Sequence, residues 1–187
     1  MKKLNQKAKI LLIIAILLLI ACRGDEQAYD TNVSISKDEP PFVPLGHYWL
    51  IDKVGVLKKE TIIKADAICQ SLQDDGIAEM VVLVQKGIKQ PEKYATHYGR
   101  WLKLGKKGRS TAGGNNGIVW LIRPDAKLKM TISVGRGLPR FTSSDYGEVM
   151  EKAKEYLNFN NFDYGVIVII EETNKRLREL YPKGGIQ

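Results

Sequence analysis

Residues 78–85 read AEMVVLVQ, an almost unbroken apolar stretch near the middle of the chain. A short run of this kind, rich in β-branched residues, is typical of a strand that is buried on both faces. Residues 118–123, IVWLIR, form a second run of the same type. Buried strands need helices on both sides of their sheet, so the two runs together predict an α/β fold.

Helical patterns lie before and after the first run. Residues 59–75 predict an amphipathic helix that Gly76 ends. One face of this helix carries Ile62, Ala65, Ile68, Cys69 and Leu72. The position of Cys69 on this apolar face predicts a small buried thiol. Pro91 suits the first turn of a second helix, which we expect to reach about residue 104.

A hairpin is expected around the second run. Residues 124–127, PDAK, have the composition of a turn. The segment that follows, 128–134, alternates and predicts a strand. Its apolar side is made of Leu128, Met130, Ile132 and Val134. The two strands on either side of the turn therefore predict an antiparallel pair.

Two helices are expected near the carboxyl terminus. Asp145 and Glu148 resemble a loose capping box before a helical pattern that reaches residue 157. Residues 166–170 are all β-branched, which locally favours a strand, but residues 171–180 are helical in composition. We interpret 163–180 as one helix whose first half is buried all round. The complete order predicts an α/β sheet with helices on both faces.

The amino terminus has the pattern of an export signal. Lysines at positions 2, 3, 7 and 9 precede an apolar run, residues 10–21, that is shorter than the roughly 20 residues needed to span a bilayer. Residues 19–22, LIAC, resemble the box of a bacterial lipoprotein signal. The resemblance implies cleavage before Cys22 and a lipid, such as palmitate, on that cysteine. The alternative is an uncleaved membrane anchor.

These patterns predict three regions: a signal peptide at 1–21, a polar tether at 22–44 and one folded domain at 45–187. The domain is then extracytoplasmic, held in the cell envelope or periplasm by the lipid anchor. The net charge is +8, and removing the four signal lysines leaves +4. So small an excess gives no reason to expect nucleic acid as a partner; the surplus lysines fit a solvated face or anionic headgroups.

Several short motifs follow one another along the chain in an order that can be compared with known families. They are Asp52-x-x-Gly55-x-Leu57, Tyr94-Ala95 with Trp101 and Gly105, Asn115-Asn116-Gly117, Val134-Gly135-x-Gly137-Leu138 and Asp163-Tyr164-Gly165. Over residues 48–180 this order resembles the TPM domain family. The resemblance implies a three-layer α/β/α sandwich with a small mixed central sheet, and a membrane-associated location. Some members bind divalent cations, a plant relative is an acid phosphatase, and others assist assembly or repair.

The resemblance also implies where a cation would bind. The corresponding region contains Asp52, Asn115 and Asn116, whose oxygens suit a hard cation such as Ca²⁺. Asp52 is the one carboxylate among them, so we expect a weak or empty site; Asp125 and Asp163 are candidate additional ligands. Ordinary turn chemistry is the alternative for all of these residues.

Catalytic motifs are scarce. The sequence contains neither G-x-S-x-G nor H-E-x-x-H. The basic, glycine-rich stretch 105–117 could contact an anion through Arg109, and the G-x-G segment could do so through Arg136. A solvated loop and a tight turn are the simpler interpretations of these two segments.

Three functional hypotheses remain from the sequence. The first is a lipid-anchored module that binds a divalent cation or an envelope protein and supports assembly or maintenance of envelope complexes. The second is a metal-dependent phosphatase acting on phosphomonoesters, in which the metal activates water. The third is a structural domain whose partners contact the basic loop. Whether the chain is an enzyme stays open, with the first hypothesis favoured.

Overall fold

Four strands form one mixed sheet in the order β1-β2-β3-β4. In the computed structural model, which describes residues 49–105 and 114–182, β1 (Leu50–Asp52), β2 (Glu79–Val84) and β3 (Gly117–Ile122) are parallel. β4 (Met130–Val134) runs antiparallel to β3, which confirms the predicted hairpin. Every residue of β2 and β3 is buried, as the two apolar runs indicated.

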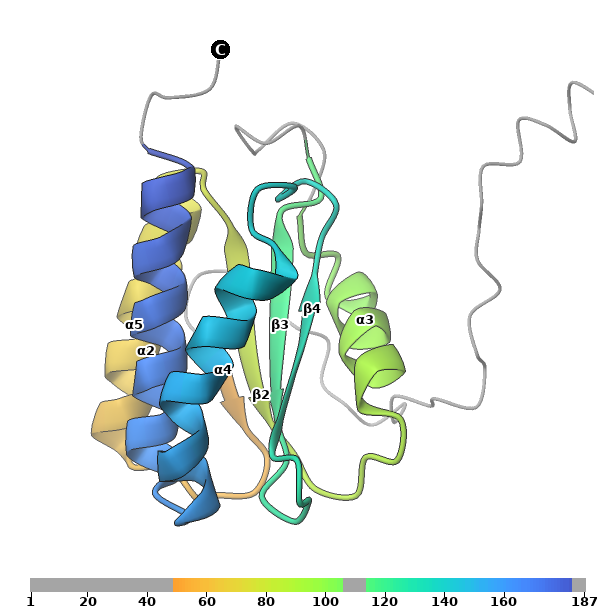
Figure 1. Cartoon of the computed structure of the whole chain (residues 1–187), viewed down its shortest axis with the longest axis vertical. Helices are drawn as coiled ribbons and strands as arrows, with labels where there is room; N and C mark the ends of the chain where they lie inside the picture. Colours follow the sequence, from red (N-terminus) through yellow and green to blue (C-terminus); the bar gives the residue numbers. More distant parts are fainter. Residues whose placement is uncertain (1–48, 106–113, 183–187) are drawn as a thin grey trace, which may run out of the picture. The chain divides into compact units, whose positions relative to one another are not determined.

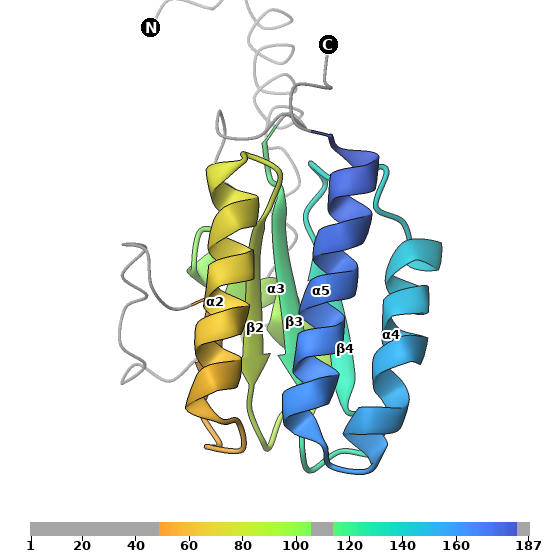
Figure 2. The same ribbon diagram turned by 90° about the vertical axis from the view of Figure 1, so that its left-hand side faces the viewer.

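Helices cover both faces of this sheet. Figures 1 and 2 show α2 (Lys59–Asp74), α5 (Phe162–Leu180) and α4 (Ser143–Asn158) side by side on one face, and α3 (Pro91–Trp101) on the other. The predicted three-layer sandwich with a small mixed sheet is therefore confirmed. Within the described ranges, no helix combines the length and apolar character needed to span a membrane.

The two parallel connections differ in hand. The strand order advances in the same direction from β1 to β2 and from β2 to β3, yet α2 and α3 lie on opposite faces. Two such crossovers must have opposite hands, so one of them is of the rare left-handed kind. As a result α3 lies apart from the other described helices, and the strands that it mainly contacts are β3 and β4.

The first strand was not predicted. β1 has only three residues, too few for a recognisable pattern. Hydrogen bonds to a side chain of α2 and to the backbone of β2 hold it in place. Leu50 N–H donates to Asp66 Oδ1 at 2.8 Å, and Val82 N–H donates to the Trp49 carbonyl at 2.8 Å. This edge strand depends on tertiary contacts with α2 and β2, which its own sequence does not reveal.

The capping prediction for α4 was wrong by one turn. The helix begins at Ser143, and Thr142 is its cap: the amide and hydroxyl of Thr142 donate to Asp145 Oδ2 at 2.6 and 2.8 Å. Glu148 is exposed and takes no part in the box. Burial alone would raise the pKa of Asp145, but the Thr142 bonds and the ion pair with Arg176 outweigh it and lower that pKa.

Residues 162–180 form one helix, as predicted, in spite of the β-branched run. Buried Val166, Ile169 and Ile170 lie in its first half, and tertiary burial outweighs the local preference for a strand. The expectation that this half is buried all round was wrong. Tyr164 is 63% exposed, because α5 belongs to an outer layer with solvent on its far side.

β4 is also shorter than predicted. Leu128 lies in the turn before the strand and is 59% exposed, whereas Met130 on the same predicted face is buried. The alternating pattern extends beyond the last residue that pairs with β3, since the register ends with Ile122 opposite Met130.

Candidate functional site

Asp52 ends β1 and organises the loop that leads to α2. Its Oδ1 accepts from the amides of Val54 and Gly55, both at 2.9 Å, and its Oδ2 accepts from the Leu57 amide at 2.8 Å. Gly55 adopts φ +71°, a conformation that glycine allows without strain. The Asp-x-x-Gly-x-Leu motif therefore builds a loop through backbone bonds to one carboxylate.

The Asn-Asn-Gly motif lies just before β3. Asn115, at φ 56°, donates its amide to the Gly105 carbonyl at 2.6 Å and accepts from the Gly137 amide at 2.9 Å. Asn116 is 2% exposed and donates from Nδ2 to the Ile77 carbonyl at 3.1 Å. Its Oδ1 is buried and has no partner among the residues that the structure describes. Both asparagines thus hold neighbouring loops together.

The Val134-Gly135-x-Gly137-Leu138 motif needs glycine at both positions, because each glycine lies against the backbone of another loop. A β-carbon on Gly135 would overlap the Asn115 carbonyl oxygen, and one on Gly137 would overlap the Gly114 carbonyl oxygen. Backbone packs directly against backbone here, which leaves no room for any side chain. Arg136 between them is exposed.

Sequence reasoning missed Glu79 in this region. The residue is 6% exposed, and its Oε2 accepts from the Gly105 amide at 2.7 Å. Gly105 itself has φ +72° and lies so close to Asn116 that a β-carbon could not be accommodated. A single acid inside an otherwise apolar strand is the signal that could have identified it, because buried carboxylates need donors.

The three predicted cation ligands do not come together. Asp52 lies level with Val84 and Ile122, at the carboxyl ends of the parallel strands. Asn115 and Asn116 precede Gly117, at the amino end of β3. Five residue steps along a strand separate the two levels by about 16 Å. The structure therefore does not bring Asp52 together with Asn115 and Asn116, because parallel strands put motifs that follow and precede a strand at opposite ends.

The two additional candidates lie at the same end as Asp52, but their carboxylates hold loops too. Asp125 Oδ2 accepts from the Gly87 amide at 2.9 Å, and this bond is the main cause that lowers the pKa of Asp125. Asp163 Oδ1 accepts from the Lys58 amide at 2.8 Å and from the Thr61 hydroxyl at 2.6 Å. Burial would raise the pKa of Asp163, but these two bonds lower it overall. In the described part of the chain, no three His, Cys, Asp or Glu residues cluster as metal ligands do.

The remaining candidates have separate positions. Cys69 is fully buried, and burial raises the pKa of its thiol, which fits the predicted packing role. The Tyr94, Tyr98 and Trp101 rings of α3 pack in a row, with centroids 6.0 and 5.7 Å apart. Cys22 and Arg109 lie outside the described residues.

The fold and these loops define a class of protein: an α/β/α domain whose short sequence motifs form two sets of loops, one at each end of a short sheet. The TPM domain model matches residues 50–176, and the chain therefore belongs to the TPM domain family. No curated protein matches the chain.

Two solved structures support the fold. The N-terminal domain of the cg2496 protein from Corynebacterium glutamicum is 12% identical, with a TM-score of 0.54, and the match covers 77% of this chain and 88% of that one. The N-terminal domain of a protein from P. gingivalis is 14% identical, with a TM-score of 0.57, and the match covers 71% and 86% respectively. At these identities the likeness concerns the fold alone.

Proposed function

We propose that this chain is a lipid-anchored protein of the cell envelope whose TPM domain is a binding module for an envelope protein. The observation that carries the proposal is the use of the motif side chains. The side chains of Asp52, Asn116 and Asp163 bond to backbone groups or to a neighbouring hydroxyl, and Asn115 bonds through its own backbone, so that the loops are held in fixed shapes. Motif residues used in this way make a rigid surface, which is what recognition of a partner requires.

The amino end of the sheet is the surface that we assign to the partner. The segments 114–117 and 135–137 are locked together by the close glycine contacts, and Arg136 and Arg140 are exposed beside them. The Arg140 guanidinium lies over the Tyr181 ring, 5.8 Å from its centroid, and the Arg140 amide donates to the Tyr181 hydroxyl oxygen at 2.7 Å. Exposed arginines on a rigid base favour an acidic protein surface as the partner.

A divalent cation at Asp52, Asn115 and Asn116 is not part of this proposal, because the fold separates those residues. The phosphatase alternative would need that cation to activate water, and nothing in the described residues favours it.

The anchor is tested by labelling the full chain with a palmitate analogue in a bacterium that makes lipoproteins. The chain has two cysteines, Cys22 and Cys69, which provide a matched pair of variants. We expect Cys22→Ser to abolish the label and Cys69→Ser to retain it. Label that persists in Cys22→Ser would refute the anchor.

The binding surface is tested by a photo-crosslinking residue placed at Arg136 or, as a control, at exposed Lys175 on α5. We expect a defined crosslinked product from position 136, lost on Arg140→Glu, and none from position 175. Identical products from the two positions would contradict the proposed surface.

A further inference from the structure

Exposed apolar side chains gather at one end of the domain. Among the described residues, the large hydrophobic side chains with high exposure number five, and four of them belong to the β3–β4 turn, the end of α4 and the start of α5. These four are Leu128 at 59%, Tyr156 at 39%, Phe159 at 79% and Tyr164 at 63%. Leaving so much apolar surface in water is costly, which indicates a binding surface.

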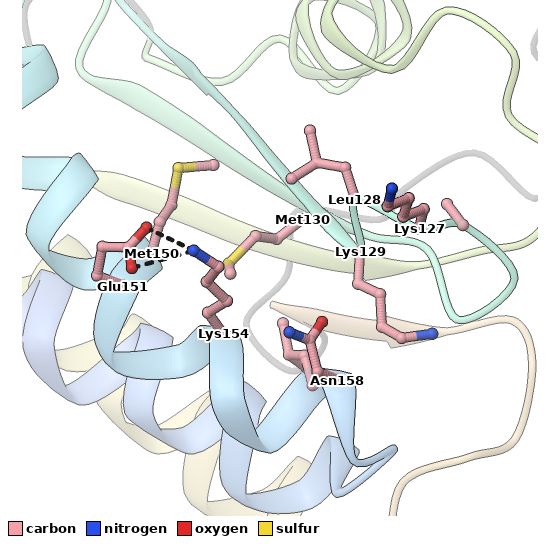
Figure 3. Close-up of a pocket in the computed structure, with 10 residues that line it drawn as sticks. Lys127, Leu128, Lys129, Met130, Met150, Glu151, Lys154 and Asn158 are labelled. Atoms are coloured by element: carbon pink, nitrogen blue, oxygen red, sulfur yellow. Dashed lines mark hydrogen bonds and ion pairs between the residues drawn. The ribbon is translucent and has the colours of Figure 1, made fainter.

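Contacts link the three elements that carry these residues. The Tyr156 and Tyr164 rings stack with centroids 5.8 Å apart, which links α4 to α5. The Lys129 ammonium lies 5.7 Å from the centroid of the Phe162 ring, which links the hairpin to α5. An open groove of about 580 Å³ lies between the hairpin and α4, with Leu128, Met130, Met150 and Leu157 in its lining (Figure 3).

The charged side chains that line the groove are mainly positive. The same groove is lined by Lys127, Lys129 and Lys154, against the single carboxylate of Glu151. Figure 3 shows Lys154 directed toward Glu151, and the two are 3.1 Å apart, so these two charges form an ion pair and Lys127 and Lys129 remain. Lys127 is exposed, and Lys129 is partly exposed while its ammonium donates to the Pro124 carbonyl at 2.7 Å. We call Lys127, Leu128, Lys129, Tyr156, Phe159 and Tyr164 the hairpin-end surface.

We propose that the hairpin-end surface rests on a membrane that contains anionic lipids. Aromatic and leucine side chains insert into the boundary between headgroups and acyl chains, while lysines pair with anionic headgroups. Phe159 and Leu128 suit this role because they project from a helix end and a turn, where insertion does not require the backbone to unfold. The lysines of the groove select the lipid as occupant, since Lys127 and Lys129 add positive charge beyond the Lys154–Glu151 ion pair. Of the carboxylates that border the surface, Asp125 accepts from the Gly87 amide and Asp163 from Lys58 and Thr61, while Glu155 is exposed beside Tyr156.

This inference rests on the proposed anchor at Cys22, which keeps the domain near lipid. An anchor on the same chain keeps the surface at a high local concentration over the membrane. The hairpin-end surface lies at the carboxyl ends of the parallel strands, and the loops assigned to a protein partner lie at their amino ends. A domain that rests on lipid in this way would turn those loops away from the membrane.

The test is hydrogen exchange of the full chain on two kinds of vesicle, one of phosphatidylcholine and one that also contains phosphatidylglycerol. We expect added protection of residues 124–130 and 156–164 on the anionic vesicles, and its loss at high salt. Each lysine near an anionic surface changes affinity about fivefold, so Lys127→Glu should lower the ratio of docked to undocked domain by at least that factor. Phe159→Ser should lower it as well, and Lys175→Glu, exposed elsewhere on α5, should leave it unchanged.

Three outcomes would overturn the proposal. Equal protection on the two kinds of vesicle would show that anionic lipid is not the occupant. Protection that appears only at high protein density would assign the surface to a second copy of the chain, and protection without vesicles would assign it to the chain itself. Mass spectrometry of the same sample reports the lipid on Cys22, so a failed anchor is recognised separately from a failed surface.

Discussion

The two ends of the sheet are built in different ways. At the amino end, the segments 114–117 and 135–137 pack backbone against backbone, and glycines are needed because no β-carbon fits. At the carboxyl end, Asp52, Asp125 and Asp163 hold the loops by accepting from amides and a hydroxyl. Substitutions that add atoms should therefore destabilise the amino end, and substitutions that remove carboxylate oxygens should destabilise the carboxyl end. The carboxyl end also carries the exposed aromatic side chains of Tyr156, Phe159 and Tyr164.

The largest effect is expected from adding one methyl group at the amino end. Gly137→Ala places a β-carbon against the Gly114 carbonyl, which is backbone and cannot rotate away. We expect a loss of about 3 kcal/mol in the free energy of unfolding, measured by urea denaturation. Gly147→Ala is the control, because Gly147 lies inside α4 with open space around it; there we expect a gain of about 0.5–1 kcal/mol. Equal effects at the two positions would contradict the close packing.

A smaller loss is expected from removing the acceptor at the carboxyl end. Asp52→Ala leaves three amides of the β1–α2 loop without their partner, at a cost of about 2 kcal/mol. Because the carboxylate acts on the backbone, we expect the same decrease in melting temperature with and without Ca²⁺. A rise in the melting temperature of the unaltered chain on adding Ca²⁺, absent in Asp52→Ala, would instead indicate a cation site at this loop.

Acid should selectively weaken the contact between α5 and the loop before α2. The pKa of Asp163 is lower in the folded chain than the usual value near 3.9, so its stabilising contribution is complete above that value and is lost as the pH falls through the folded pKa. We expect Asp163→Asn to cost about 1 kcal/mol at neutral pH and progressively less below about pH 4. The measurement is urea denaturation of the two chains across this range; a pH-independent difference would rule out the ionised carboxylate as the cause.

The smallest effect is expected at the hairpin-end surface. Phe159 is 79% exposed, so Phe159→Ser should change the free energy of unfolding by less than about 0.5 kcal/mol. Thermal denaturation of the chain in the absence of lipid provides the measurement. A loss of several times that size would mean that Phe159 serves the fold, and would remove the argument that this end is reserved for binding.

Sequence patterns located most of the elements. The buried runs at 78–85 and 118–123 identified β2 and β3, and helical spacing identified α2, because burial on both faces leaves a continuous apolar run and burial on one face leaves a periodic pattern. β1 left no such trace, since three residues held by α2 and β2 have no period of their own. The capping box of α4 was placed one turn late, because Asp145 and Glu148 have the right spacing but Thr142 has the hydroxyl.

The candidate site was less predictable than the fold. The motif residues were found by their order along the chain, but order does not say which end of a strand each one occupies. The buried carboxylate of Glu79 was missed because its neighbours in sequence are apolar and its donor, the Gly105 amide, comes from another loop. The hairpin-end surface was missed because its residues come from three elements that are separate in sequence.

The sequence by itself determined the α/β class, the order of most helices and strands, and the family, because these depend on local periodicity and on motif order. Only the tertiary structure decided that Asp52 lies about 16 Å from the level of Gly117, which follows Asn116, that α3 is the described helix on its face of the sheet, and that lysines and aromatic rings share one end. The physical reason is that parallel strands and the opposite hands of the two crossovers set which loops meet, and neither property is recorded in the spacing of residues along the chain.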